Sequence, residues 1–113
     1  MKIKTAELAE RALDYAVCVA GAKGEVSWTW FLGKDYALKY STDWGIGGPI
    51  IEREWIELFV QTGADDQHRW AGKHHPIGGL CAVADGPTSL VAAMRCYTAS
   101  ELGNEVEVPD ELC

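Results

Sequence analysis

The sequence predicts an α+β fold: a small, mainly antiparallel sheet with two main helices packed on one face. Apolar residues recur at three- and four-residue spacing near both ends of the chain, which indicates two helices. Between them, short stretches alternate apolar and polar residues and are bounded by turn-forming residues, which is typical of strands. With 113 residues, 48% of them hydrophobic, the chain fits a single domain over residues 1–113.

Each predicted helix has a residue that favours its start and a glycine that favours its end. Thr5 is a good N-cap, so the first helix is expected over Ala6–Ala20. Thr88 precedes the second helix, which is expected over Ser89–Leu102.

Four stretches in the middle of the chain are candidate strands. Alternation predicts a strand over Val26–Leu32 and a short one over Tyr36–Tyr40. A further strand is expected at about residues 54–61, and His68–Lys73 is expected to return as its antiparallel partner after a turn.

A glycine-rich stretch, residues 41–48, is predicted to be irregular. Gly45–Gly48 is neither a Walker A loop nor a dinucleotide-binding fingerprint, and Pro49 is expected to open a single helical turn. One interpretation is a tight turn that needs positive φ. The other is a backbone nest whose N–H groups bind an anion, with Asp43 and Trp44 offering a hydrogen-bond acceptor and a stacking face.

The charge distribution limits the class of partner. Seventeen acids against ten Lys and Arg give a net charge of −7. The C-terminal tail, about residues 103–113, is acidic and is interpreted as a solvated end that aids solubility. Double-stranded nucleic acid is a poor partner because the chain has no basic stripe, whereas a small anionic ligand needs only a few local cations.

Cysteine usage and hydropathy indicate a reducing, cytoplasmic environment. The chain shows neither a secretory signal nor a membrane-spanning stretch, and its four cysteines form no C-x-x-C motif. All four are therefore expected to be free thiols.

Neither a metal site nor a catalytic site is predicted. The spacing of the histidines is not typical of zinc sites, and they are interpreted as part of a local cationic edge formed by His68, Arg69, Lys73, His74 and His75. Cys81 or Ser41 could act as a nucleophile with a histidine as its base, but no nucleophile motif surrounds either residue. No catalytic residue and no cofactor is therefore expected. Two pairs of neighbouring acids are interpreted as exposed surface rather than as a catalytic pair. They are Glu52 with Glu54, and Asp65 with Asp66.

Several segments resemble the NinX-like proteins of tailed phages and prophages. They are Met1–Leu8, Ser41–Trp44, Gly47–Glu52, Pro87–Arg95 and Leu102–Pro109. The resemblance covers nearly the whole chain; family members often have proline where this chain has Ser89, which changes little because Thr88 still caps the helix. It implies a phage accessory protein of the host cytoplasm and supplies no catalytic mechanism.

These observations together predict a non-catalytic, homo-oligomeric counter-defence protein that sequesters a small anionic ligand, a nucleotide immune signal above all. It is expected to bind neither double-stranded nucleic acid nor a membrane. Two alternatives stay open: a protein-binding inhibitor or adaptor that uses Trp55 or the acidic tail against a host defence factor, and a small hydrolase. The predicted ligand-binding residues are Ser41, Thr42, Asp43, Trp44, Gly47, Gly48, Arg69, Trp70 and Arg95.

Overall fold

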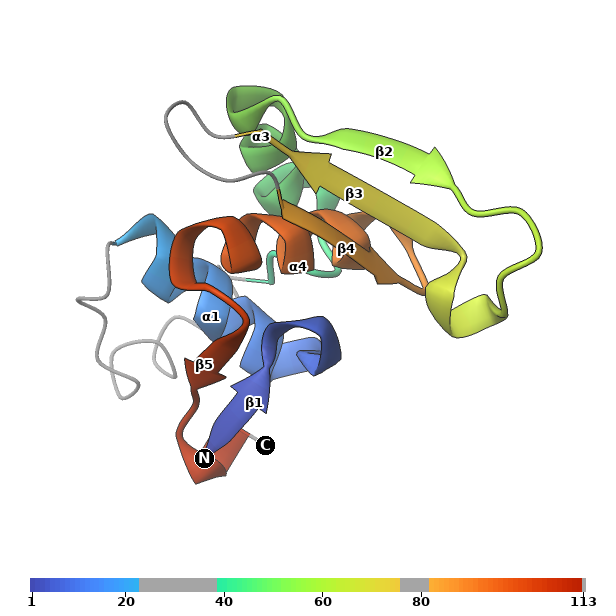
Figure 1. Ribbon diagram of the computed structural model, residues 1–113. Coiled ribbons are helices and arrows are strands. Elements are labelled where there is room, and N and C mark those ends of the chain that lie inside the picture. The colour runs from blue at the N-terminus through green and yellow to red at the C-terminus, as the bar shows by residue number, and fades with distance from the viewer. Residues whose placement is uncertain (23–38, 76–81, 113) are drawn as a thin grey trace.

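A computed structural model describes residues 1–22, 39–75 and 82–112 and confirms the α+β fold. The described residues form three α-helices and two small antiparallel sheets (Figure 1). The helices are α1 (Glu10–Gly21), α3 (Trp44–Glu54) and α4 (Ser89–Leu102). The strands are β1 (Lys2–Lys4), β2 (Glu57–Val60), β3 (Trp70–His74), β4 (Ala82–Gly86) and β5 (Glu105–Glu107). Short 3-10 turns lie at η1 (Thr5–Glu7), η3 (Asp66–His68) and η4 (Asp110–Leu112).

Helix α4 is the centre of the molecule. The sheet β2-β3-β4 packs against it, α1 contacts it from another side and α3 also packs on it (Figure 1). Close approach to the sheet depends on glycine: a Cβ on Gly72 would lie 3.3 Å from the Cα of Ala93. The helix contributes Leu90, Ala93, Met94, Cys96 and Tyr97 to a continuous apolar core.

The second predicted helix is confirmed with its boundaries. Helix α4 spans Ser89–Leu102, and Thr88 Oγ1 accepts a hydrogen bond from the N–H of Val91 at 3.1 Å. Gly103 follows the helix with a φ of 89°, a conformation that favours glycine.

The predicted start of the first helix is wrong. Helix α1 begins at Glu10, and a 3-10 turn occupies Thr5–Glu7. Thr5 does not cap a helix; its hydroxyl donates to the carbonyl of Gly103 at 2.6 Å, and its N–H donates to the carbonyl of Asn104. A contact between chain positions almost a hundred residues apart overrides the local capping preference.

The predicted hairpin in the middle of the chain is confirmed, but its strands begin later than predicted, because Glu54 belongs to α3 and His68 to η3. Strands β2 and β3 pair antiparallel, with Leu58 opposite Gly72, and β4 pairs antiparallel with β3 on its other side. Strand β4 was not predicted, because Ala82–Gly86 holds small residues with little alternation. The predicted strand Val26–Leu32 lies outside the described residues, as does most of Tyr36–Tyr40, and Tyr40 itself lies in a turn.

The interpretation of the acidic tail as a solvated end is wrong for its apolar residues. Strand β5 pairs antiparallel with β1, with Val106 opposite Ile3. Val106, Val108 and Leu112 are buried, while Glu105 and Glu107 are exposed. Acidic and apolar residues alternate, so this segment is an ordinary half-buried strand.

The glycine-rich stretch is helical, which corrects the prediction of an irregular loop. Helix α3 begins at Trp44, and Asp43 Oδ1 caps it by accepting the N–H of Gly45 at 2.8 Å. Pro49 therefore lies inside the helix rather than at its first position. The helix ends at Trp55, whose φ of 55° lies in the left-handed region. Within the described residues, no helix is long and apolar enough to cross a membrane.

Candidate ligand-binding cleft

The predicted residues at the start of α3 serve the helix and its packing. Ser41 is buried, and its N–H donates to Asp14 Oδ1 at 2.8 Å. Thr42 is exposed, and Asp43 is the N-cap. Trp44 is 53% exposed in the first helical turn.

The glycines do not form an anion-binding nest. The N–H of Gly47 donates to the carbonyl of Asp43, four residues earlier, as in an α-helix, and the N–H of Ile46 donates to the same carbonyl. Neither Gly47 nor Gly48 has positive φ. Gly47 is required for a different reason: a Cβ there would lie 2.2 Å from the carbonyl oxygen of Tyr40 and 2.8 Å from Leu90. Gly48 has only Trp44 near it, at 3.5 Å.

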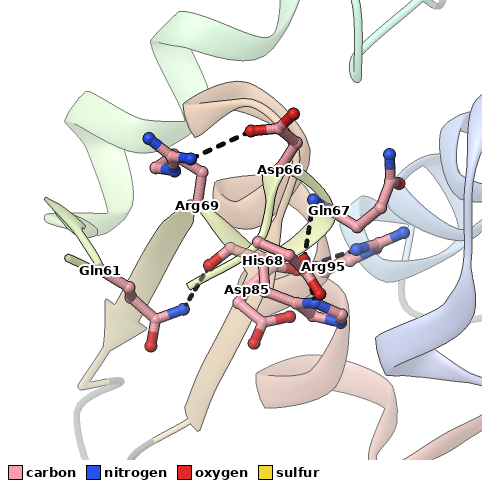
Figure 2. A network of polar contacts seen from close by, with 8 residues as sticks. Gln61, Asp66, Gln67, His68, Arg69, Asp85 and Arg95 are labelled. Carbon is pink, nitrogen blue, oxygen red and sulfur yellow. Dashed lines mark hydrogen bonds and ion pairs between the residues drawn. The ribbon is translucent and has the colours of Figure 1, made fainter. Parts of the chain in front are cut away.

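The predicted cationic edge is largely neutralised by acids at η3. Arg69 Nη2 lies 3.0 Å from Asp66 Oδ1, a contact that is drawn as a dashed line in Figure 2. His68 Nδ1 lies 2.7 Å from Asp65 Oδ1, and this contact lowers the pKa of Asp65. His74 is not at the edge at all, because its side chain is only 1% exposed. Trp70 is half-buried where β3 begins.

Arg95 holds two segments of backbone together. Its Nε donates to the carbonyl of Leu8 at 2.7 Å. Its Nη1 donates to the carbonyl of Asp85 at 2.9 Å, and Figure 2 shows these two residues side by side. Burial lowers the pKa of this guanidinium. This structural role differs from the ligand-binding role predicted for Arg95.

A different part of the molecule forms a cleft of about 380 Å³ between α1, α3 and α4. None of the nine predicted residues lines it. Helix α3 contributes one face at helical spacing, and Tyr40 and Tyr97 add aromatic walls. The lining is Val17, Cys18, Gly21, Ala22, Tyr40, Ile46, Pro49, Ile50, Arg53 and Tyr97.

Arg53 supplies the cation of this cleft. Its side chain is 58% exposed, and its Nε donates to Glu54 Oε2 at 3.0 Å. That hydrogen bond is the main reason why the pKa of Arg53 is raised. The guanidinium is therefore charged at neutral pH and lies at the solvent side of the cleft.

A chain of polar contacts links Arg53 to the centre of the molecule. Glu54 Oε1 lies 3.3 Å from His74 Nε2, and His74 Nδ1 lies 2.6 Å from Ser100 Oγ. Ser100 Oγ in turn donates to the carbonyl of Tyr97 at 2.8 Å. The order serine, histidine, acid is that of many hydrolases, but Ser100 is bonded within its own helix and is not part of the cleft lining. This series of polar contacts therefore positions α3 against β3 and α4.

The tyrosines give the cleft protonated hydroxyls. Burial raises the pKa of Tyr40 and of Tyr97, so both remain neutral hydrogen-bond donors at physiological pH. Cys18 is a free, buried thiol whose pKa burial also raises. Among the described residues, no group of three or more His, Cys, Asp or Glu side chains is placed to hold a metal ion.

A comparison with known protein families shows which family the chain belongs to. The sequence model described as Bacteriophage P22, NinX matches residues 4–101. The chain belongs to the phage P22 NinX family. The match covers α1, α3, the sheet β2-β3-β4 and α4 up to Glu101, and it includes every residue that lines the cleft. No curated protein matches the chain.

Sequence reasoning missed the cleft of this NinX family member for a definable reason. Residues 41–48 were interpreted as a loop, so Ile46, Pro49, Ile50 and Arg53 were never placed on one helix. Asp43, followed by residues at three- and four-position spacing, was the available signal. The ring of Tyr97 lies in the core, but its hydroxyl lies at the cleft, 3.8 Å from the Cβ position of Gly21.

Proposed function

We propose that the chain binds a small anionic ligand with a planar ring in the cleft between α1, α3 and α4. The observation that carries the proposal is that one arginine and two neutral tyrosines line a single cavity of about 380 Å³. Small-molecule sites span roughly 300–1,000 Å³ and combine apolar walls with a few polar groups. The volume of this cleft lies near the lower end of that range, which favours a mononucleotide-sized ligand over a larger one.

The chemistry of the walls fits a nucleotide. Arg53 presents a planar guanidinium, which can bind a phosphate through two parallel hydrogen bonds. Tyr40, which is half-buried, provides a ring for stacking, and Tyr40 and Tyr97 provide hydroxyls for hydrogen bonding. Ile46, Pro49 and Ile50 supply the apolar floor from one face of α3.

The role that we propose is sequestration of a nucleotide immune signal by a phage accessory protein in the host cytoplasm. Membership of a phage family and a binding cleft support this role. The proposal is non-catalytic: Ser100, whose hydroxyl contacts His74, donates to a helix carbonyl and does not line the cleft.

A retention assay tests this function. The purified protein is incubated with a panel of nucleoside monophosphates and cyclic mono- and dinucleotides, washed, and heated, and the released material is chromatographed. Recovery of an intact nucleotide is expected. Recovery of an altered nucleotide would indicate an enzyme, and a protein that retains none of them would contradict the proposal.

A second candidate function, binding of a host protein, is favoured by Trp55. This side chain is 86% exposed, and its backbone adopts a left-handed conformation that usually selects glycine at the end of a helix. Both features lower the stability of the fold, and this favours a role for Trp55 in binding another protein. Trp55→Gly is expected to fold at least as well as the natural chain; retention of full affinity for a host partner by this variant would remove the argument.

A further inference from the structure

Among the described residues, strand β2 forms an open edge of the sheet. The strand order is β2-β3-β4, so β2 has one neighbour among the described strands. Three of its four residues are exposed, including Phe59 at 44% and Val60 at 48%. The strand contains neither proline nor lysine, the residues that commonly protect such edges from pairing with another chain.

The unpaired backbone groups of this edge can be assigned. The N–H of Gln61 donates to the carbonyl of Arg69 at 2.7 Å, which places Gln61 in a hydrogen-bonded pair. Such pairs alternate along an antiparallel ladder, so Phe59 and Glu57 also direct their N–H and C=O groups toward β3. Leu58 and Val60 direct theirs outward, and no described backbone group pairs with them there.

The opposite edge of the sheet is partly occupied. On β4 the outward-facing carbonyl of Asp85 accepts from Arg95 at 2.9 Å, whereas Ala82 and Ala84 direct their backbone groups toward β3. Residues 4–6 of the N-terminal segment share a 260 Å³ cleft with Val83 and Ala84 of the same strand. A strand added to this sheet therefore fits at β2.

We propose that β2 pairs antiparallel with β2 of a second copy of this chain, with Phe59 opposite Phe59 of that copy. In this register Leu58 and Val60 of each copy exchange N–H···O bonds with Val60 and Leu58 of the other, giving four bonds. The two Phe59 rings form a cross-strand aromatic pair, and Glu57 faces Gln61 of the second copy, so no like charges meet.

Neighbouring registers are less favourable. Pairing centred on Leu58 requires the N–H of Ile56, which already donates to the carbonyl of Ile51 at 3.1 Å. A shift further in the same direction brings Glu57 opposite Glu57 of the second copy. Pairing centred on Val60 relies on Thr62, which lies beyond the end of the strand. Only the register centred on Phe59 satisfies all four outward groups with residues of the strand itself.

Disulfide trapping tests this register without dependence on the ligand cleft. A pair at the two-fold axis that is not hydrogen-bonded has its Cα atoms about 4.5 Å apart, within the disulfide range. Phe59→Cys is therefore expected to form a covalent dimer under mild oxidation. Glu57→Cys is the matched control on the same strand face, since its thiols would lie about 14 Å apart in this register.

We expect at least about tenfold more covalent dimer from Phe59→Cys than from Glu57→Cys. Equal yields from the two variants, or a yield from Phe59→Cys no higher than that of the natural chain, would overturn the proposal. Light scattering on the natural chain is expected to give twice the mass of one chain at micromolar concentration, and a monomer there would also overturn it.

Charge substitutions provide a second, reversible test. Phe59→Glu places two carboxylates face to face across the two-fold axis, and we expect it to weaken dimerisation at least about tenfold. Val83→Glu adds the same charge to another exposed position on the same sheet face and is expected to leave the dimer intact. Equal dimerisation of both variants, each folded by circular dichroism, would contradict the proposal.

Discussion

The Nε2 atom of His74 lies 3.3 Å from Oε1 of Glu54, and it joins the end of α3 to the centre of the sheet. Because Arg53 is bonded to the other oxygen of the same carboxylate, the position of the cleft cation depends on this buried histidine. The tilted ring of Tyr97, with its centroid 6.3 Å from that of His74, packs beside the contact.

Removal of this histidine should destabilise the fold. His74→Ala leaves a cavity and removes the partner of Glu54 and Ser100, so we expect a loss of about 2–4 kcal/mol in the free energy of unfolding. His75→Ala, at the exposed next position, is the matched control and should change stability by less than about 0.5 kcal/mol. Similar urea midpoints for both variants would show that His74 does not hold α3 in place.

Two adjacent glycines of α3 should respond oppositely to the same substitution. Gly47→Ala forces a Cβ to 2.2 Å from the carbonyl oxygen of Tyr40, so we expect a loss of about 1–3 kcal/mol. Gly48→Ala meets only Trp44 at 3.5 Å and should gain about 0.5–1 kcal/mol from helix propensity. Thermal melts of the two variants check this, and a stabilising Gly47→Ala would refute the close packing of α3.

Arg95 should matter for stability rather than for ligand binding. Arg95→Leu leaves the carbonyls of Leu8 and Asp85 without their donors, and we expect a loss of about 2–4 kcal/mol. Arg69→Leu removes only an exposed ion pair with Asp66 and should cost less than about 1 kcal/mol. Chemical denaturation of both variants decides the matter, and equal losses would contradict the assigned roles.

Stability should fall at alkaline pH. Burial raises the pKa of Cys18, Tyr15, Tyr40 and Tyr97 above the ordinary values of 9.0 for the thiol and 10.0 for the phenols. The folded state favours the neutral forms, so this contribution is complete below the unfolded pKa values and is lost as pH rises through the folded ones. Urea melts from about pH 8 to about pH 11 should show the decline, and Tyr40→Phe should reduce it. A flat profile would contradict the burial of these groups.

The sequence predicts the parts of this fold that local signals determine. The threonine cap and following glycine define α4, and alternation defines the hairpin of β2 and β3. It does not predict the pairing of β1 with β5 or the role of Thr5, because both depend on contacts between the two ends of the chain. The prediction at α3 was wrong because its three glycines and one proline suggested a loop.

The candidate cleft was unpredictable for a related reason. Its residues come from α1, α3 and α4, and only the fold brings Cys18, Arg53 and Tyr97 to one cavity. The sequence does not distinguish the roles of the three arginines. Arg69 and Arg53 each pair with an acid, but only Arg53 faces the cleft, and Arg95 binds backbone carbonyls.

Calorimetric titration of the natural chain and two arginine variants tests the binding cleft most directly. The probe is the nucleotide retained best in the retention assay, titrated alongside inorganic phosphate. Arg53→Gln should weaken nucleotide binding at least about tenfold, because a charge-assisted bidentate contact to phosphate is lost. Arg69→Gln, which removes a comparable charge outside the cleft, should bind as the natural chain does. Unchanged affinity in Arg53→Gln, or equal weakening in both variants, would contradict the assignment of the ligand site to this cleft.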